Sequence, residues 1–180
     1  MKRPGKIILG LAALAGGLLL MACQNKDAPL ATAPYVDLNK YMGTWYEIAS
    51  FPQRFQKGCH CTKAEYKMNP EGFVEVRNSC RKDSPEGKLK GITGKAFVED
   101  TQTNAKLKVQ FFWPFKGDYW IIDLAPDYSY AVVGAPNREY LWILSREKQM
   151  APQLYQQIVG SIKKKGFDVA RLQVTDQSCR

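Results

Sequence analysis

The sequence predicts an all-β fold: an eight-stranded antiparallel up-and-down barrel, with one α-helix packed outside it near the C-terminus and a short ninth strand after the helix. Short runs of alternating apolar and polar residues follow one another from residue 43 onward, separated by turn residues. A single amphipathic stretch comes after the eighth run. Because closure removes the unpaired edges of a sheet, this pattern is typical of a closed barrel that can enclose one small ligand.

Eight runs have strand character, and Gly, Pro, Asn or Asp residues mark the turns between them. The runs span residues 44–51, 61–68, 73–80, 90–99, 105–113, 118–125, 128–134 and 139–146. We expect turns at 69–72, 100–104, 114–117, 125–127 and 135–137. Connections this short join antiparallel neighbours, since parallel strands need a crossover of a dozen or more residues.

Two of the runs indicate what the barrel buries. The run over 105–113 is apolar on one face and polar on the other, with Leu107, Val109, Phe111 and Trp113 opposite Lys106, Lys108 and Gln110. The run over 139–146 is apolar on both faces, with Tyr140, Trp142 and Leu144 on one and Leu141 and Ile143 on the other. A strand covered on both sides needs another element packed outside it.

The amphipathic stretch at 151–166 is the predicted cover. Pro152 suits the first turn of a helix, and Gly166 suits its C-terminal end. Leu154, Ile158 and Ile162 recur every four residues, which places them on one helical face. The run over 170–176 is predicted as the ninth strand.

The N-terminus has the layout of a secretory signal peptide. Lys2, Arg3 and Lys6 precede an apolar run that ends at Cys23. The residues LMAC (20–23) resemble the lipobox of bacterial lipoproteins, which implies that the Cys23 thiol receives a diacylglycerol and that the mature chain begins there. Removing the three basic residues lowers the formal net charge from +9 to +6.

These features divide the chain into a lipoprotein signal peptide (1–22), a lipidated tether (23–35) and a single barrel domain (36–180). In lipoproteins an Asp directly after the cysteine favours retention in the inner membrane. Gln24 therefore points to the outer membrane. We expect the protein to be held there by its lipid anchor and to face the periplasm.

Three motifs in the barrel domain resemble those of the lipocalin family. GTWYEIA (43–49) matches the G-x-W motif of the first strand, DYSY (127–130) resembles the second motif, and Arg146 matches the basic residue of the third. The resemblance covers the whole mature domain. Within the family, the chain most resembles bacterial outer-membrane lipoprotein lipocalins of the Blc type and is close to apolipoprotein D.

The motif residues have structural roles that follow from their chemistry. Gly43 permits a tight turn into the first strand, and Trp45 is expected to plug the narrow end of the barrel. Arg146 is expected to lie over the indole in a cation–π contact of about 1–2 kcal/mol. The resemblance places Asp127 and Tyr128 at the turn between the sixth and seventh strands.

The open end of the barrel is the predicted ligand site. If Arg146 points inward, alternation places Leu144, Trp142 and Tyr140 on the inner wall, progressively nearer the mouth. The same argument assigns Leu107, Val109 and Phe111 to the wall, although a shift of one residue would exchange them for Gln110 and Phe112. The resemblance implies fatty acids or lysophospholipids as ligands. Haem, a pigment or a signalling lipid is an alternative ligand for the same site. A second alternative is that these aromatic side chains fill the barrel as core and leave no space for a ligand.

The segment QKGCHCTK (56–63) concentrates two cysteines and the single histidine. If it is extended, Cys59 and Cys61 point to one side and His60 to the other, so the three do not readily hold one metal ion or form a disulfide between neighbours. In an oxidising compartment the cysteines left after Cys23 allow two disulfides, in three connectivities. The resemblance to apolipoprotein D implies that Cys61 pairs with Cys179, which leaves Cys59 with Cys80.

The sequence favours a binding protein over an enzyme, without a cofactor, a metal or a nucleic-acid partner. It has no GxSxG, P-loop or GxGxxG motif, and one histidine leaves no usual triad. The alternative is a thiol-dependent lipid isomerase of the prostaglandin-synthase type, which requires a free thiol at Cys59, Cys61 or Cys80. The aromatic turn FFWPFKGDYW (111–120) suits three roles that the sequence does not separate: a homodimer contact at the rim, a gate of the pocket, or an edge that touches the membrane.

Overall fold

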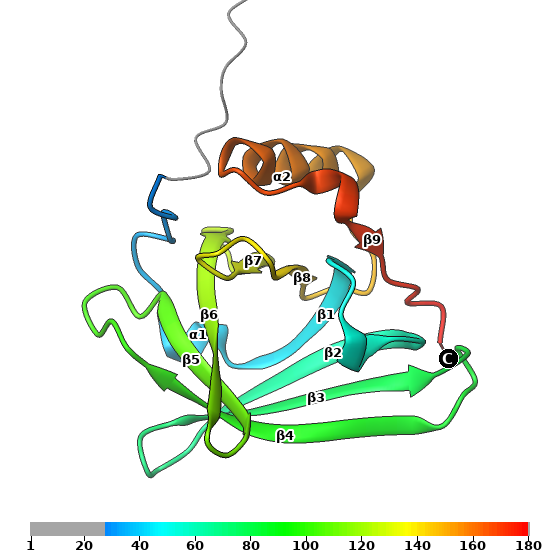
Figure 1. Cartoon of the computed structure of the whole chain (residues 1–180), viewed down its shortest axis with the longest axis horizontal. Coiled ribbons are helices and arrows are strands. Elements are labelled where there is room, and N and C mark those ends of the chain that lie inside the picture. Colours follow the sequence, from blue (N-terminus) through cyan, green and yellow to red (C-terminus); the bar gives the residue numbers. More distant parts are fainter. Residues whose placement is uncertain (1–27, 180) are drawn as a thin grey trace, which may run out of the picture.

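Nine antiparallel strands make one continuous sheet in the computed structural model, which describes residues 28–179. The order β2-β3-β4-β5-β6-β7-β8-β1-β9 closes on itself because β1 also pairs with β2 (Figure 1). The strands are β1 (Gly43–Ser50), β2 (Cys59–Met68), β3 (Val74–Lys82), β4 (Leu89–Val98), β5 (Lys106–Phe112), β6 (Phe115–Leu124), β7 (Tyr130–Gly134), β8 (Leu141–Ser145) and β9 (Gln173–Val174). The predicted fold class is confirmed.

Two helices accompany the barrel. α1 (Leu38–Tyr41) precedes β1, and Asp37 caps it by accepting a hydrogen bond of 2.9 Å from Asn39 N. α2 (Pro152–Lys164) lies outside the barrel, across β7 and β8 (Figure 1). Short 3₁₀ turns occur at Arg54–Gln56 and at Val169–Arg171.

The two ends of the barrel differ. Because neighbouring strands alternate in direction, one end carries the connections 51–58, 83–88, 113–114 and 135–140. The other end carries the connections 69–73, 99–105 and 125–129, together with α1. We call the first end the open end and the second the closed end, since α1 and the Trp45 indole pack across the second.

Strand β1 changes partner along its length. Its first half pairs with β2, from Gly43 opposite Tyr66 to Tyr46 opposite Lys63. Its second half pairs with β9, where Ser50 lies opposite Gln173. Toward the open end, therefore, β2 leaves β1 and the C-terminal tail takes its place.

The apolar side chains form two cores. An inward core fills the closed half of the barrel and includes Trp45, Leu107 and Leu144. A second core lies between the barrel and α2, where Ile158 and Ile162 are 2% and 0% exposed. β8 contributes to both, since Leu144 belongs to the inward core while Leu141 and Ile143 belong to the outer one. The prediction that the helix covers the outer face of this strand is confirmed.

Two predicted boundaries are wrong. β6 begins at Phe115 rather than at residue 118, because Phe112 pairs with Phe115 across a two-residue turn and extends the hairpin into the predicted turn at 114–117. Trp113 consequently lies in the turn, 86% exposed, instead of on the inner wall. The ninth strand keeps only Gln173–Val174 of the predicted 170–176, since a 3₁₀ turn occupies Val169–Arg171.

The described part of the predicted tether, residues 28–35, packs against the barrel. Leu30 and Ala33 are 6% and 5% exposed, and Ala33 N donates a hydrogen bond of 2.8 Å to Ile121 O. Arg138 Nη2 donates one of 2.6 Å to Ala28 O. The segment therefore packs as part of the barrel domain, since Ala33 belongs to the inward core and Leu30 to the outer one. The predicted signal peptide and Cys23 lie outside the described residues.

Candidate ligand-binding site

The closed end is sealed by Trp45 and Arg146. The indole is 0% exposed, and its Nε1 donates a hydrogen bond of 2.8 Å to Tyr41 O. Arg146 Cζ lies 3.8 Å from the ring centroid, and the guanidinium donates to Thr44 O at 2.8 Å and to Lys40 O at 2.7 Å. The cation–π contact expected from the sequence is present, and the guanidinium connects the end of β8 to α1 and to the start of β1.

The second motif ties a turn to α1. Asp127 Oδ1 accepts a hydrogen bond of 3.0 Å from Ser129 N. Hydrogen bonds from the Ser129 side chain and, after it, from the Ser129 backbone lower the pKa of the Asp127 carboxyl. Tyr128 has a φ of +61°, and its hydroxyl accepts a bond of 2.8 Å from Asp37 N. Asp127 and Tyr128 lie between β6 and β7, as the resemblance implies.

Five of the six predicted wall residues lie on the inner face of the barrel, and Tyr140 is not part of the inward core. Leu107 and Leu144 belong to the inward core, and Val109, Phe111 and Trp142 pack against it. Phe112 is 69% exposed on the other face, so the register assumed for β5 is the one observed.

Side-chain exposure rises toward the open end, from β8 into the connection that precedes it. Leu144 is 5% exposed, Trp142 is half-buried, and Tyr140 is 41% exposed with its ring stacked on that of Trp142 at a centroid distance of 6.1 Å. The wall is thus apolar and becomes accessible to solvent at the mouth, which suits a ligand with an apolar chain.

Three tyrosines inside the barrel were missed by the sequence reasoning. The Tyr119 hydroxyl lies 2.8 Å from the hydroxyls of both Tyr41 and Tyr66. Burial raises the pKa of all three phenols, that of Tyr66 to about 12. Alternation along β2 and β6 would have placed Tyr66 and Tyr119 inward, but no local pattern brings Tyr41 of α1 to them.

A cavity of about 460 Å³ opens where β2 leaves β1. Its lining comes from the end of β1, the β1–β2 connection and the C-terminal tail. Glu47, which is 5% exposed, accepts hydrogen bonds there from Ser50 Oγ at 3.0 Å, Gln56 Nε2 at 2.8 Å and Thr175 Oγ1 at 2.5 Å. Gln56 Oε1 in turn accepts a bond of 3.2 Å from Trp142 Nε1, which connects this cavity to the inner wall. The sequence reasoning assigned Glu47 no role.

Two disulfides flank the cavity. Cys59 is bonded to Cys80, with the Cα atoms 5.4 Å apart, and Cys61 is bonded to Cys179, with the Cα atoms 6.1 Å apart. These are the pairs that the resemblance implies. Cys61 N also donates a hydrogen bond of 2.7 Å to Asp176 O, so a backbone contact adds to the disulfide in holding the tail to β2.

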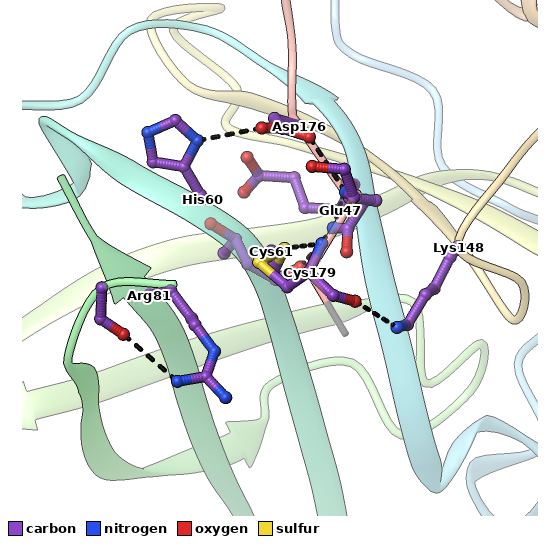
Figure 2. The surroundings of a disulfide bond; sticks show 11 residues. Glu47, His60, Cys61, Arg81, Lys148, Asp176 and Cys179 are labelled. Atoms are coloured by element: carbon purple, nitrogen blue, oxygen red, sulfur yellow. Dashed lines mark hydrogen bonds and ion pairs between the residues drawn. A yellow bond between two sulfur atoms is a disulfide. The ribbon is translucent and has the colours of Figure 1, made fainter. Parts of the chain in front are cut away.

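The expected alternation from Cys59 to Cys61 does not hold. Cys61 has a φ of +52°, and the β2–β3 register shifts between His60 and Lys63. The His60 ring is directed toward Asp176, and its Nδ1 lies 3.2 Å from Asp176 Oδ2, near the Cys61–Cys179 disulfide (Figure 2). Hydrogen bonds from Ser178 and, to a lesser extent, His60 lower the pKa of Asp176. Within residues 28–179 no group of His, Cys, Asp or Glu is arranged to hold a metal ion.

A closed eight-stranded barrel whose apolar inner wall opens at one end defines a protein that binds a small hydrophobic molecule. The comparisons agree, since residues 36–177 match the family described as a lipocalin-like domain. The chain belongs to the lipocalin family.

Several relatives cover most of the chain. Temperature-induced lipocalin-1 of Arabidopsis thaliana is 42% identical over 79% of this chain and 80% of its own, and the outer membrane lipoprotein Blc of Escherichia coli is 36% identical over 89% and 92%. Apolipoprotein D of Mus musculus is 33% identical over 96% and 95%. The solved structure of insecticyanin from Manduca sexta superposes with a TM-score of 0.65 at 22% identity, over 83% and 85% of the two chains, and shows the shared fold. The similarity to Blc-type lipoproteins and to apolipoprotein D is confirmed.

Proposed function

We propose that this protein carries fatty acids or lysophospholipids in its barrel and serves lipid maintenance in the cell envelope. The observation that supports this is the inner wall, apolar from Leu144 to Tyr140 and progressively more exposed toward the mouth. An acyl chain along this wall buries methylenes at about 0.8 kcal/mol each, while its headgroup stays at the open end. The membership of the lipocalin family supports binding over catalysis.

We further propose that Cys23 carries the lipid anchor and that the anchor holds the barrel at the outer membrane, facing the periplasm. The lipobox-like residues support the anchor, and the similarity to the outer membrane lipoprotein Blc supports the location. In the part of the chain that the structure describes, no helix is long and apolar enough to cross a membrane.

The geometry of the chain supports an orientation with the mouth toward the bilayer. The Ala28 carbonyl accepts a hydrogen bond from Arg138, which lies in the 135–140 connection at the open end. Only residues 24–27 separate Ala28 from Cys23, so an anchor at Cys23 lies within about 18 Å of the open end even with an extended chain.

Native mass spectrometry of the protein isolated from its own membrane tests the proposal. We expect a mass increase at the N-terminal peptide that corresponds to a lipidated Cys23, two disulfides, and a bound acyl lipid. The same protein, after its ligand is removed, should show Trp fluorescence quenching by a lysophospholipid, and the substitution Trp142→Phe should reduce that signal because Trp142 lies on the inner wall. No retained lipid and no quenching would overturn the proposal, whereas bound haem, pigment or a signalling lipid would redirect it to those ligands.

The thiol-dependent isomerase is disfavoured by a positive finding. Cys59, Cys61 and Cys80, the candidate nucleophiles, are each bonded to another sulfur. A count of free thiols in the unreduced protein tests this directly, since one free thiol per chain would restore the alternative.

A second copy of the chain is the other candidate partner of the open end. Phe55, Phe112, Trp113 and Phe115, which we call the rim aromatics, are 69–86% exposed there. Light scattering with and without lipid separates the two uses of the rim: a dimer in solution favours self-association, and a monomer favours contact with the membrane.

A further inference from the structure

The carboxylate of Glu47 is buried without a cation. Its three hydrogen-bond donors, Ser50, Gln56 and Thr175, are neutral. None of the ion pairs in the part of the chain that the structure describes includes Glu47. Buried carboxylates are ordinarily paired with a positive charge, because isolating one from water is costly. The position therefore suits a positive group supplied by a ligand.

Further acceptors lie around Glu47 unused. Thr62 is 8% exposed, and its hydroxyl has no hydrogen-bond partner within residues 28–179. Gln177 donates from Nε2 to Glu47 O and Thr62 O, both at 2.8 Å, while its buried Oε1 has no partner among the same residues. The Glu47 carboxylate and the unpaired Thr62 hydroxyl both line one cavity, and an unmatched hydroxyl beside a carboxylate favours a ligand with N–H donors.

There is room for such a ligand. Glu47 and Thr62 both line the cavity of about 460 Å³, a volume within the range of ~300–1,000 Å³ typical of ligand pockets. Arg54 and Lys57 line the same cavity and are exposed. The cavity therefore offers a negative, buried floor and positive groups at its edge.

We propose that this cavity binds the primary ammonium of a zwitterionic aminoalkyl phosphate headgroup. The ammonium donates to the Glu47 carboxylate and the Thr62 hydroxyl, and the phosphate lies near Arg54 and Lys57. The inference rests on the proposed function, in which the acyl chain lies along the inner wall. Gln56 makes hydrogen bonds to both Glu47 and Trp142, and it therefore joins the headgroup cavity to that wall.

The chemistry distinguishes headgroups that are otherwise alike. A primary ammonium has three N–H donors for the acceptors of the cavity. A choline headgroup has the same charge but no N–H donor, and a glycerol headgroup has hydroxyl donors but no positive charge. Of the three headgroups, only the primary amine combines a positive charge for Glu47 with an N–H donor for the Thr62 hydroxyl.

A competition experiment tests the proposal on the full-length protein. The protein in detergent receives an equimolar mixture of a fatty acid, lysophosphatidylethanolamine, lysophosphatidylcholine and lysophosphatidylglycerol with the same acyl chain, and native mass spectrometry reports which are bound. We expect lysophosphatidylethanolamine to exceed each of the other two lysolipids by about tenfold, as for one charge-assisted hydrogen bond. Equal occupancy by the three lysolipids would overturn the proposal.

Variants locate the preference. Glu47→Gln should lower the ratio of bound lysophosphatidylethanolamine to bound fatty acid by about tenfold, and Thr62→Val should lower it less, since it removes a hydroxyl and keeps the shape. Glu65→Gln is the matched control, because Glu65 is an outer β2 carboxylate that pairs with Lys63 at 3.3 Å, away from the cavity. A ratio unchanged in both Glu47→Gln and Thr62→Val would contradict the assignment.

Two further arms complete the test. Chain-free phosphoethanolamine at the concentration of the lysolipids should not bind, whereas its binding would identify a soluble aminoalkyl phosphate as the source of the ammonium and overturn the lipid assignment. The two proposals also fail differently. A protein that binds no acyl lipid at all contradicts the proposed function, and one that binds acyl lipids without regard to headgroup contradicts only this inference.

Discussion

Arg146 connects α1 and β1 at the closed end. It contacts the Trp45 indole at 3.8 Å and donates to backbone carbonyls of Lys40 and Thr44. Arg146→Ala should lower the free energy of unfolding by about 2–4 kcal/mol, since it removes the cation–π contact and leaves these carbonyls without their charged donor. Denaturant unfolding measures the loss, and Arg146→Lys should recover only part of it because an ammonium lacks the planar fork.

A change within about 0.5 kcal/mol for Arg146→Ala would place Arg146 among ordinary surface residues and contradict its role.

The buried tyrosines give the stability of the fold an alkaline limit. In the unfolded chain Tyr66 ionises near the ordinary tyrosine pKa of 10.0, whereas burial raises the pKa in the folded protein to about 12. Between these pH values the folded protein binds more protons than the unfolded chain. The contribution of neutral Tyr66 to the free energy of unfolding is therefore fully present below pH 10 and falls as the pH rises toward 12. For Tyr66 alone the loss amounts to about 2–3 kcal/mol.

Unfolding by denaturant at pH 9 to 12, with phenolate absorbance followed in parallel, measures this effect. Tyr66→Phe should make the decline shallower, because it removes one of the phenols that must ionise. A decline of equal steepness in Tyr66→Phe would show that Tyr66 ionises in the folded protein as it does in the unfolded chain.

Among the elements, the C-terminal tail is the one that completes the sheet. β9 replaces β2 beside the second half of β1, and the Cys61–Cys179 disulfide holds the tail there. The bond spans 118 residues, whereas Cys59–Cys80 spans 21. Closing the longer loop restricts the unfolded chain more.

We expect the double substitution Cys61→Ser/Cys179→Ser to lower the free energy of unfolding by about 5 kcal/mol and Cys59→Ser/Cys80→Ser by about 3 kcal/mol. Only the first should also speed hydrogen exchange at Thr175 N, which donates to Ile48 O at 2.9 Å. The opposite order of stabilities, or equal exchange at Thr175 in the two variants, would contradict the role of the tail.

At the scale of the whole molecule, the first described residues and the mouth of the barrel lie at the same end. The rim aromatics and the Arg138 bond to Ala28 both lie at the open end. If the anchored protein stands with its mouth toward the bilayer, Trp113 in the β5–β6 turn reaches the acyl region, where Trp side chains are favoured near the interface.

Vesicles that contain brominated lipids test this orientation with the full-length lipidated protein. We expect quenching of Trp fluorescence that Trp113→Phe largely removes. Trp120→Phe is the matched control, since Trp120 is on the same hairpin but packs against the outer core, and it should leave most of the quenching in place. Equal quenching in both variants would mean that the rim does not meet the membrane.

Much of this arrangement follows from local sequence. Alternation with a period of two placed Leu144 and Trp142 on one wall and Leu141 and Ile143 under the helix, because side chains of a strand alternate in direction wherever the strand is regular. Prediction was wrong where regularity ends. The tight β5–β6 turn exposed Trp113, and the positive φ of Cys61 broke the expected alternation.

The sequence by itself determined the barrel, the covering helix, the sealed end at Trp45 and the inner wall, since each depends on periodicity or on a motif within one strand. Only the tertiary structure decided the tyrosine cluster and the cavity beside Glu47. Tyr41 and Tyr119 are 78 residues apart in the chain, and Glu47 and Thr175 are 128 apart. These contacts depend on where the β1–β2 pairing ends and on how the C-terminal tail pairs with β1 beyond that point. A local sequence pattern cannot predict contacts between segments that are so far apart in the chain.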